Sequence, residues 1–105
     1  MQNLPNPHVR TRVRLLNTSE GGRRGPTPEG MAFGCLIVIE EQNYDCRMVP
    51  VGAASFKPGA EAEALIQFVS PELIVASLHV GKKFHVRDGR IVGEGEVLEV
   101  LPGAR

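Results

Sequence analysis

Hydrophobic and polar positions alternate along several short segments of the chain. Residues 8–16 show a period-two pattern in which apolar positions alternate with arginines, as expected for a strand with one buried face. Residues 32–40 form a near-continuous apolar run, and residues 44–51 return after a polar turn at Glu41-Gln42-Asn43. Residues 61–69 alternate again; Glu-Ala-Glu-Ala-Leu also has good helix propensity, but the strand-rich surroundings favour a strand. The expected inward positions of the first strand are Val9, Thr11, Val13 and Leu15.

The last part of the sequence predicts a β-hairpin. Phe84 and Val86 alternate with polar residues, Asp88-Gly89 is a strong turn signal, and residues 90–101 return with one charged and one apolar face. Residues 72–80 predict either a further strand or an irregular excursion. With about six or seven short strands and no convincing helix, the pattern predicts an all-β barrel or sandwich.

Length and composition are consistent with one small domain. The 105 residues suffice for one modest core, and we expect a lead-in at residues 1–7, a single domain over residues 8–101 and a tail at 102–105. Twelve basic residues balance twelve acidic ones, which weighs against strong RNA binding. The sequence shows neither a membrane-spanning apolar segment nor a signal peptide, so we expect a cytoplasmic protein.

No pattern of residues predicts catalysis or cofactor binding. The three histidines are scattered without a second ligand at metal-binding spacing, and no Gly-x-Ser-x-Gly or phosphate-binding loop is present. We therefore expect no enzyme activity, nucleotide, metal or other cofactor. Cys35 and Cys46 fall on adjacent hairpin arms; they could be neighbours, and two reduced, buried thiols are favoured over a disulfide.

Two groups of basic residues are the candidate binding elements. The first is the outer face of the first strand, which is either a binding surface or simply solvated. The second is the loop Gly21-Gly22-Arg23-Arg24, whose guanidiniums can donate paired hydrogen bonds to phosphate or carboxylate, or can be solvated as well. The outer-face arginines of the first strand are Arg10, Arg12 and Arg14.

Four segments in the same order resemble the C-terminal β-barrel (domain III) of elongation factor Tu and related translation GTPases. Residues 84–97 read Phe-x-x-Arg-Asp-Gly-Arg-x-Val-Gly-x-Gly-x-Val, the closing hairpin of that domain. Residues 12–23 match its first strand and Glu-Gly-Gly-Arg loop, residues 56–62 its Pro-Gly entry into the fourth strand, and Ser70-Pro71 its His-Pro. The resemblance covers residues 8–101 and implies a six-stranded antiparallel Greek-key barrel without the GTPase domain.

The resemblance also implies which residues contact partners. In the family, this barrel contacts aminoacyl-tRNA, the GTPase domain and the exchange factor. Here the loop after Arg23 is rewritten and the closing turn is one residue shorter than the family's Glu-Gly-Gly-Arg. We therefore expect a non-catalytic module that binds a protein, with translation-related partners in view; the alternative is a module that binds tRNA-like RNA through its arginines. The positions that match tRNA-contacting residues of the family are Gly21, Gly22, Arg23, Arg87, Gly89 and Arg90.

Overall fold

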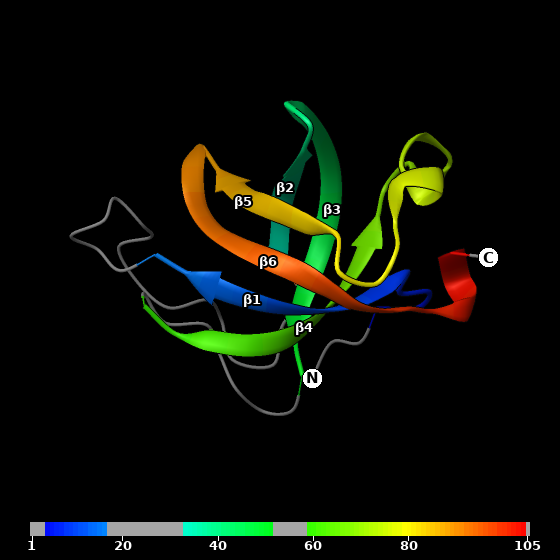
Figure 1. The fold of residues 1–105 in the computed structure, drawn as a ribbon, viewed down its shortest axis with the longest axis horizontal. Helices are drawn as coiled ribbons and strands as arrows, with labels where there is room; N and C mark the ends of the chain where they lie inside the picture. The colour runs from blue at the N-terminus through cyan, green and yellow to red at the C-terminus, as the bar shows by residue number, and fades with distance from the viewer. Residues whose placement is uncertain (1–3, 17–32, 52–58, 105) are drawn as a thin grey trace.

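Six antiparallel strands close into a barrel in the computed structural model, which describes residues 4–16, 33–51 and 59–104. The strand order around the barrel is β1-β4-β3-β2-β5-β6, and β6 returns to pair with β1 (Figure 1). This confirms the predicted all-β, six-stranded antiparallel barrel. Because β5 follows β4 in sequence but lies beside β2, the order is that of a Greek key. The strands are β1 (Val9–Leu15), β2 (Phe33–Ile39), β3 (Gln42–Pro50), β4 (Glu61–Phe68), β5 (Lys83–Asp88) and β6 (Arg90–Val100).

Strand β1 has the alternation that the sequence predicts. Its four inward positions are buried, whereas its arginines are half-buried or exposed. Thr11 is the polar member of the inward set, and its hydroxyl donates a hydrogen bond of 3.0 Å to the carbonyl oxygen of Ala64. A buried hydroxyl needs such a partner, so the barrel accommodates Thr11 without an unsatisfied group.

Strand β4 settles the choice between helix and strand for residues 61–69. Its 8 residues pair with β1 on one side and β3 on the other. Ala64, Ile66 and Phe68 are buried, and Glu61 and Glu63 are exposed. Two-sided pairing outweighs the local helix propensity, because a strand buries the apolar face and satisfies the backbone at once.

The core fills the inside of the barrel. Its members come from all six strands and from the connection between β4 and β5. In that connection Ile74 and Leu78 are buried, so the segment covers one end of the barrel. The buried core residues are Val9, Val13, Leu15, Cys35, Ile37, Ile39, Cys46, Met48, Ala64, Ile66, Phe68, Ile74, Leu78, Phe84, Val86, Val92 and Val97.

The β4–β5 connection is irregular, which is one of the two alternatives predicted for residues 72–80. It contains two short 3₁₀ turns, η2 (Pro71–Leu73) and η3 (Val75–Ser77). Ile74, between them, is buried, whereas Leu73 and Val80 are exposed. The alternation of buried and exposed apolar residues does not follow a strand period here, because the backbone turns between them.

The β2–β3 hairpin turns earlier than predicted. The sequence suggested a turn at Glu41-Gln42-Asn43, but the strands are joined by Glu40 and Glu41, with Ile39 paired to Gln42. Both loop residues have positive φ, 52° and 68°, as in a type I′ turn. A one-residue shift of register would turn the buried face of a strand outward, so the match of the two apolar faces fixes the turn.

The closing hairpin turns where the sequence predicts. Asp88 and Arg90 are paired residues, and Gly89 between them has a φ of 77°. Just before the turn the register shifts, because Val86 pairs with Gly93 and Arg87 pairs with Ile91. The extra residue in β6 is a β-bulge, which bends the strand where the barrel curves.

A second bulge lies between β1 and β6. Thr11 is opposite Val97, whereas the preceding Arg10 is opposite Glu99, so Leu98 is an additional residue in β6. The bulge reverses the alternation along β6. As a result Glu96 and Glu99, three residues apart, both face outward beside β1.

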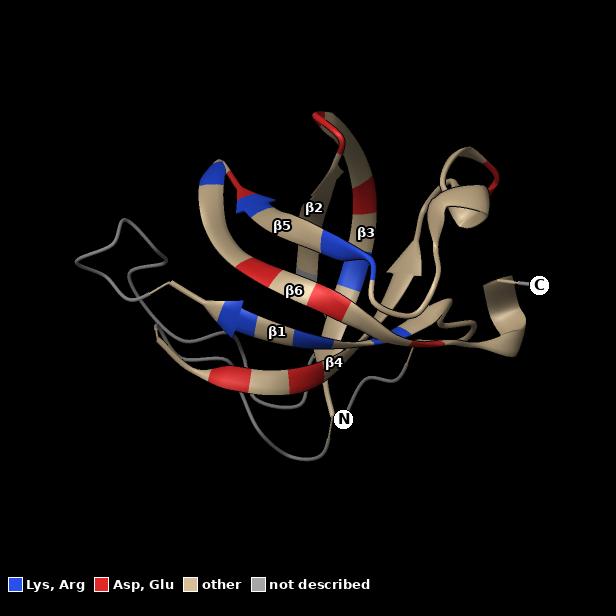
Figure 2. Cartoon of the chain, viewed as in Figure 1, with Lys and Arg blue, Asp and Glu red and all other residues tan. Residues whose placement is uncertain are grey.

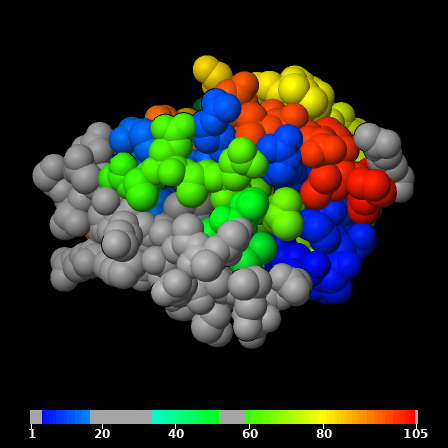
Figure 3. Space-filling model, turned by 90° about the horizontal axis from the view of Figure 1, so that it is seen from below, coloured from blue at the N-terminus to red at the C-terminus, as the bar shows by residue number. Residues whose placement is uncertain are grey.

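The two ends of the described chain lie next to each other at one end of the barrel (Figures 1 and 3). The backbone of His8 is hydrogen-bonded to Ile66 and Leu101. After β6 the chain forms a further short 3₁₀ turn, η4 (Pro102–Ala104), and Ala104 is buried. In the segment expected as a lead-in, the backbone N–H of Asn6 donates a hydrogen bond of 2.9 Å to Oε1 of Gln67 in β4. The expected lead-in and tail thus both include residues that contact the barrel or are buried.

Candidate functional site

The arginines of β1 lie on the outer face of the barrel between two acidic strands. Because β1 pairs with both β4 and β6, Arg12 and Arg14 stand opposite a glutamate on each side. Arg10 stands opposite Glu99 of β6 and Leu65 of β4. Figure 2 shows the basic bands of β1 between the acidic bands of β4 and β6. We call this set the arginine–glutamate ladder. Its members are Arg10, Arg12, Arg14, Glu61, Glu63, Glu94, Glu96 and Glu99.

Arg10 makes the closest contacts of the ladder. Its Nη1 lies 2.7 Å from Oε1 of Glu63, and its Nε lies 3.1 Å from Oε1 of Glu99. The hydrogen bond that Arg10 donates to Glu63, followed by the one that it donates to Glu99, raises the pKa of Arg10 above its ordinary value. Arg10 therefore bridges β4 and β6 across β1.

The other two arginines also lie beside carboxylates of the neighbouring strands. Nε of Arg12 lies 3.5 Å from Oε1 of Glu61, and Nε of Arg14 lies 3.3 Å from Oε1 of Glu94. These side chains are between about a third and just over half exposed, so each pair adds little to stability. Their effect is on charge: the ladder holds three guanidiniums against five carboxylates.

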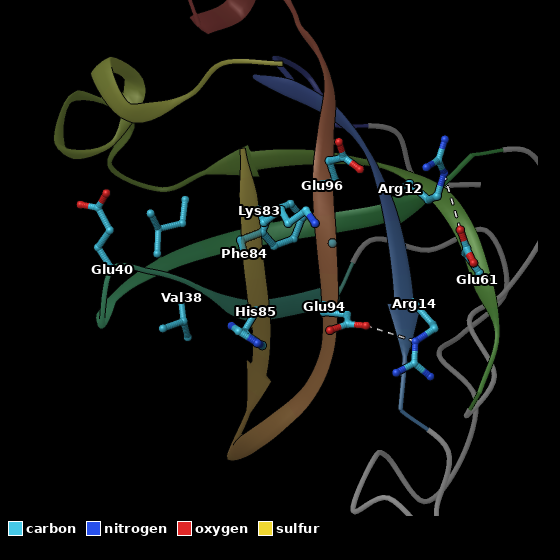
Figure 4. Close-up of a pocket in the computed structure, with 12 residues that line it drawn as sticks. Arg12, Arg14, Val38, Glu40, Glu61, Lys83, Phe84, His85, Glu94 and Glu96 are labelled. Atoms are coloured by element: carbon cyan, nitrogen blue, oxygen red, sulfur yellow. Dashed lines mark hydrogen bonds and ion pairs between the residues drawn. The ribbon is translucent and has the colours of Figure 1, made fainter. Parts of the chain in front are cut away.

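A groove of about 510 Å³ runs over the outer face of β1, β6, β5 and β2 beside this ladder. Its lining is mostly charged, and Val38 contributes an apolar side chain (Figure 4). The described lining residues include no serine, threonine, cysteine or tyrosine that could act as a nucleophile. We call it the charged groove. It is lined by Arg12, Arg14, Val38, Ile39, Glu40, Glu61, Lys83, Phe84, His85, Glu94, Gly95 and Glu96.

His85 lies in the middle of a row of residues that crosses the charged groove. It is exposed and stands opposite Val38 of β2 on one side and Glu94 of β6 on the other. Glu94 in turn pairs with Arg14 of β1 (Figure 4). The row thus presents an apolar group, an imidazole, a carboxylate and a guanidinium side by side, and it offers both hydrogen-bond donors and acceptors.

Glu96 and Lys83 form the next row of the charged groove. They are paired positions on β6 and β5, and Glu96 also stands opposite Arg12. Within the described chain, however, Arg12 makes its ion pair with Glu61, and no ion pair joins Glu96 to a neighbour. Glu96 is therefore the lining carboxylate best placed to receive a cation from a partner.

The closing hairpin forms a separate site. Arg87 and Gly89 line a second pocket of about 420 Å³, which shares no residue with the charged groove. Nε of Arg87 is buried and has no hydrogen-bond partner among the described residues. Arg90, at the start of β6, is exposed. The structure thus separates the hairpin residues from the β1 arginines.

The remaining predicted site residues lie outside the described residues. These are the loop residues Gly21, Gly22, Arg23 and Arg24. Their predicted role stays a prediction.

The sequence did not indicate Val38, Lys83 and His85 as a site. Each is an ordinary outward position on its own strand, and only the strand order brings them together. The glutamates that flank β1 were visible as outward positions. Their meeting with the arginines required the knowledge that the first strand lies between the fourth and the sixth.

No family model matches the chain. Within the described residues, no group of three or more histidine, cysteine, aspartate or glutamate side chains is placed to hold a metal ion. None of the helices in the described part of the chain has the length and apolar character needed to cross a membrane.

Proposed function

We propose that this chain is a non-catalytic binding module, resembling domain III of elongation factor Tu without a GTPase domain, that binds a protein through the charged groove. The observation that carries the proposal is the pairing of every β1 arginine with a glutamate beside an open groove. Such a surface offers fixed donors and acceptors of both signs, which suits a polypeptide segment.

The ladder argues against the alternative, a module that binds RNA through its arginines. A phosphate backbone approaching β1 would meet five carboxylates for three guanidiniums. RNA affinity depends on basic groups that release counterions from phosphates, and these arginines already have anionic partners. A protein is therefore the favoured partner, and translation-related proteins are the first to test because of the resemblance.

The charge of the groove indicates the chemistry of the partner. Its lining has four glutamates against two arginines and one lysine. Glu96 lacks an ion pair among the described residues and Val38 is partly exposed. The groove thus suits a segment that brings a lysine or arginine to Glu96 and an apolar side chain to Val38.

Affinity capture with matched variants tests this proposal. Wild type, Glu96→Lys and Glu72→Lys are immobilised and exposed to native lysate; both substitutions change charge by the same amount, and Glu72 is exposed on η2, outside the groove. We expect a protein retained by wild type and by Glu72→Lys but lost by Glu96→Lys. With that protein purified, calorimetry should show at least about tenfold weaker binding to Glu96→Lys, as for the loss of one desolvated charge pair.

Two results would contradict the proposal. One is retention of the same proteins by all three forms. The other is binding of bulk tRNA in a gel-shift assay at about 50 mM salt that falls steeply by about 200 mM, because that behaviour indicates phosphate recognition. Thermal melting of each variant checks that the barrel is folded before either assay.

A further inference from the structure

Two thiols meet inside the barrel next to the second pocket. Cys35 of β2 and Cys46 of β3 are directly opposite each other, and their sulfur atoms lie 3.4 Å apart. Both are free and buried. The charged groove contains neither of them, so their chemistry is independent of the proposed function.

The backbone geometry already suits a bond between them. Since Ile39 and Gln42 close a two-residue loop, Cys35 and Cys46, four residues further along each strand, are also a hydrogen-bonded pair. Such pairs have Cα atoms about 5.5 Å apart, within the roughly 4.4–6.8 Å that disulfides span. The sulfurs must approach from 3.4 Å to about 2.05 Å, which side-chain rotation can supply.

The second pocket gives a small oxidant a route to the sulfurs. Both cysteines line it, together with Gly34, which has no neighbouring atom where a side chain would begin. Cys35 is the more exposed of the two, at 9% against 3%. The hydrogen bond with Cys35, followed by burial, raises the pKa of Cys46 above its ordinary value. Because it is the more exposed thiol, Cys35 is the one that reacts first.

We propose that Cys35 and Cys46 form a reversible oxidation site, at which hydrogen peroxide converts the two thiols into a cross-strand disulfide. In the first step the Cys35 sulfur attacks one peroxide oxygen, the O–O bond breaks, and sulfenic acid and one water form. In the second step the Cys46 sulfur attacks the sulfenic sulfur and releases a second water. In total the two thiols lose two electrons and two protons, and the peroxide takes up these electrons and protons to form the two waters.

Mass spectrometry of the reduced full-length protein after peroxide treatment tests the proposal. Wild type should lose the mass of two hydrogens and both free thiols, and a peptide map should join the segments that contain residues 35 and 46. Dithiothreitol should restore both thiols. On a non-reducing gel the product should migrate as a monomer, because the bond is internal.

Single substitutions distinguish the two roles. Cys46→Ala removes the resolving thiol, so Cys35 should accumulate as a sulfenic acid that dimedone traps, whereas wild type should give little adduct. Cys35→Ala should react more slowly with peroxide than wild type, since the remaining thiol, Cys46, is the more buried of the two. A protein that keeps both thiols under peroxide sufficient to oxidise free glutathione would overturn the proposal, as would equal dimedone labelling of wild type and Cys46→Ala. If Cys46→Ala fails to fold, the wild-type thiol count and peptide map decide alone.

Discussion

Of the two glycines of β6, Gly95 has the tighter steric surroundings. A side chain built there would begin 2.5 Å from Cζ of Phe84 and 2.8 Å from the carbonyl oxygen of Arg12. The first contact is with a buried ring and the second with the backbone of β1, so neither can give way easily. Glycine at this position lets β1, β5 and β6 approach closely enough to close the barrel.

We therefore expect Gly95→Ala to lower the free energy of unfolding by about 1–3 kcal/mol, the usual cost of overpacking a core. Gly34→Ala is the matched control, because it adds the same methyl group to a strand position with nothing within 4 Å. It should change stability by less than about 0.5 kcal/mol. Urea unfolding followed by circular dichroism measures both. Equal losses of stability in the two variants would show that the close approach of the strands does not require glycine at position 95.

At the scale of single elements, the β2–β3 turn is unusual because it places two glutamates in the left-handed region. Side chains at positive φ cost on the order of 1 kcal/mol or more, and type I′ turns normally carry asparagine or glycine. Glu40 has a compensating contact, since Lys82 Nζ lies 3.1 Å from its Oε1. Glu41 is exposed and has a φ of 68°.

The turn strain predicts that Glu41→Gly is about 1 kcal/mol more stable to urea than Glu41→Ala. Both substitutions remove the same carboxylate and leave the Glu40–Lys82 pair in place, so they differ in the backbone freedom of residue 41. Chemical denaturation at matched pH measures the difference. Equal stability, or greater stability of the alanine variant, would mean that the turn does not hold residue 41 at positive φ in solution.

At the scale of the whole molecule, the sequence carried most of the architecture. Alternation at β1 and β4 and the Asp88-Gly89 signal predicted strands and a hairpin that the structure contains. The β2–β3 turn could not be read in the same way, because Glu40-Glu41 has no turn signature and the register depends on both apolar faces. The local residue pattern determines whether a segment forms a strand, whereas the register of that strand depends on the strand that pairs with it.

The candidate site was less predictable than the fold. The outward direction of Arg10, Arg12 and Arg14 followed from alternation alone. Their ion pairs depend on long-range neighbours, and the one with Glu99 also depends on a bulge that restores its outward direction. No residue pattern within β6 indicates that bulge. The charge of a barrel surface is thus a property of strand order and register, which single strands do not reveal.

His8 contacts both the chain after β6 and the core of the barrel: its backbone is hydrogen-bonded to Leu101, and its ring contacts Phe68. It is 2% exposed, its Nδ1 accepts a hydrogen bond of 2.9 Å from the backbone N–H of Phe68, and its ring stacks on the Phe68 ring at 6.0 Å. Its carbonyl oxygen accepts from Leu101, beyond the end of β6. Because Nδ1 is an acceptor, the ring must be neutral, with its proton on Nε2. Protonation of Nδ1 would place its N–H against the backbone N–H of Phe68, so that two donors would face each other.

This arrangement makes the stability of the whole barrel depend on pH. Burial lowers the pKa of His8 below its ordinary value of 6.5, so the unfolded chain binds the proton more readily than the folded one. The contribution of neutral His8 is therefore complete above pH 6.5 and is lost as pH falls from 6.5 through the folded-state pKa.

Urea unfolding of wild type between pH 8 and 5 should show a decline of about 1 kcal/mol or more in the free energy of unfolding, the cost of breaking the Phe68 hydrogen bond in a buried site. His8→Asn keeps an acceptor oxygen near the Nδ1 position but does not titrate, so its stability should fall less over the same range. Since His79 and His85 are exposed and present in both proteins, parallel pH profiles would assign the decline to groups other than His8.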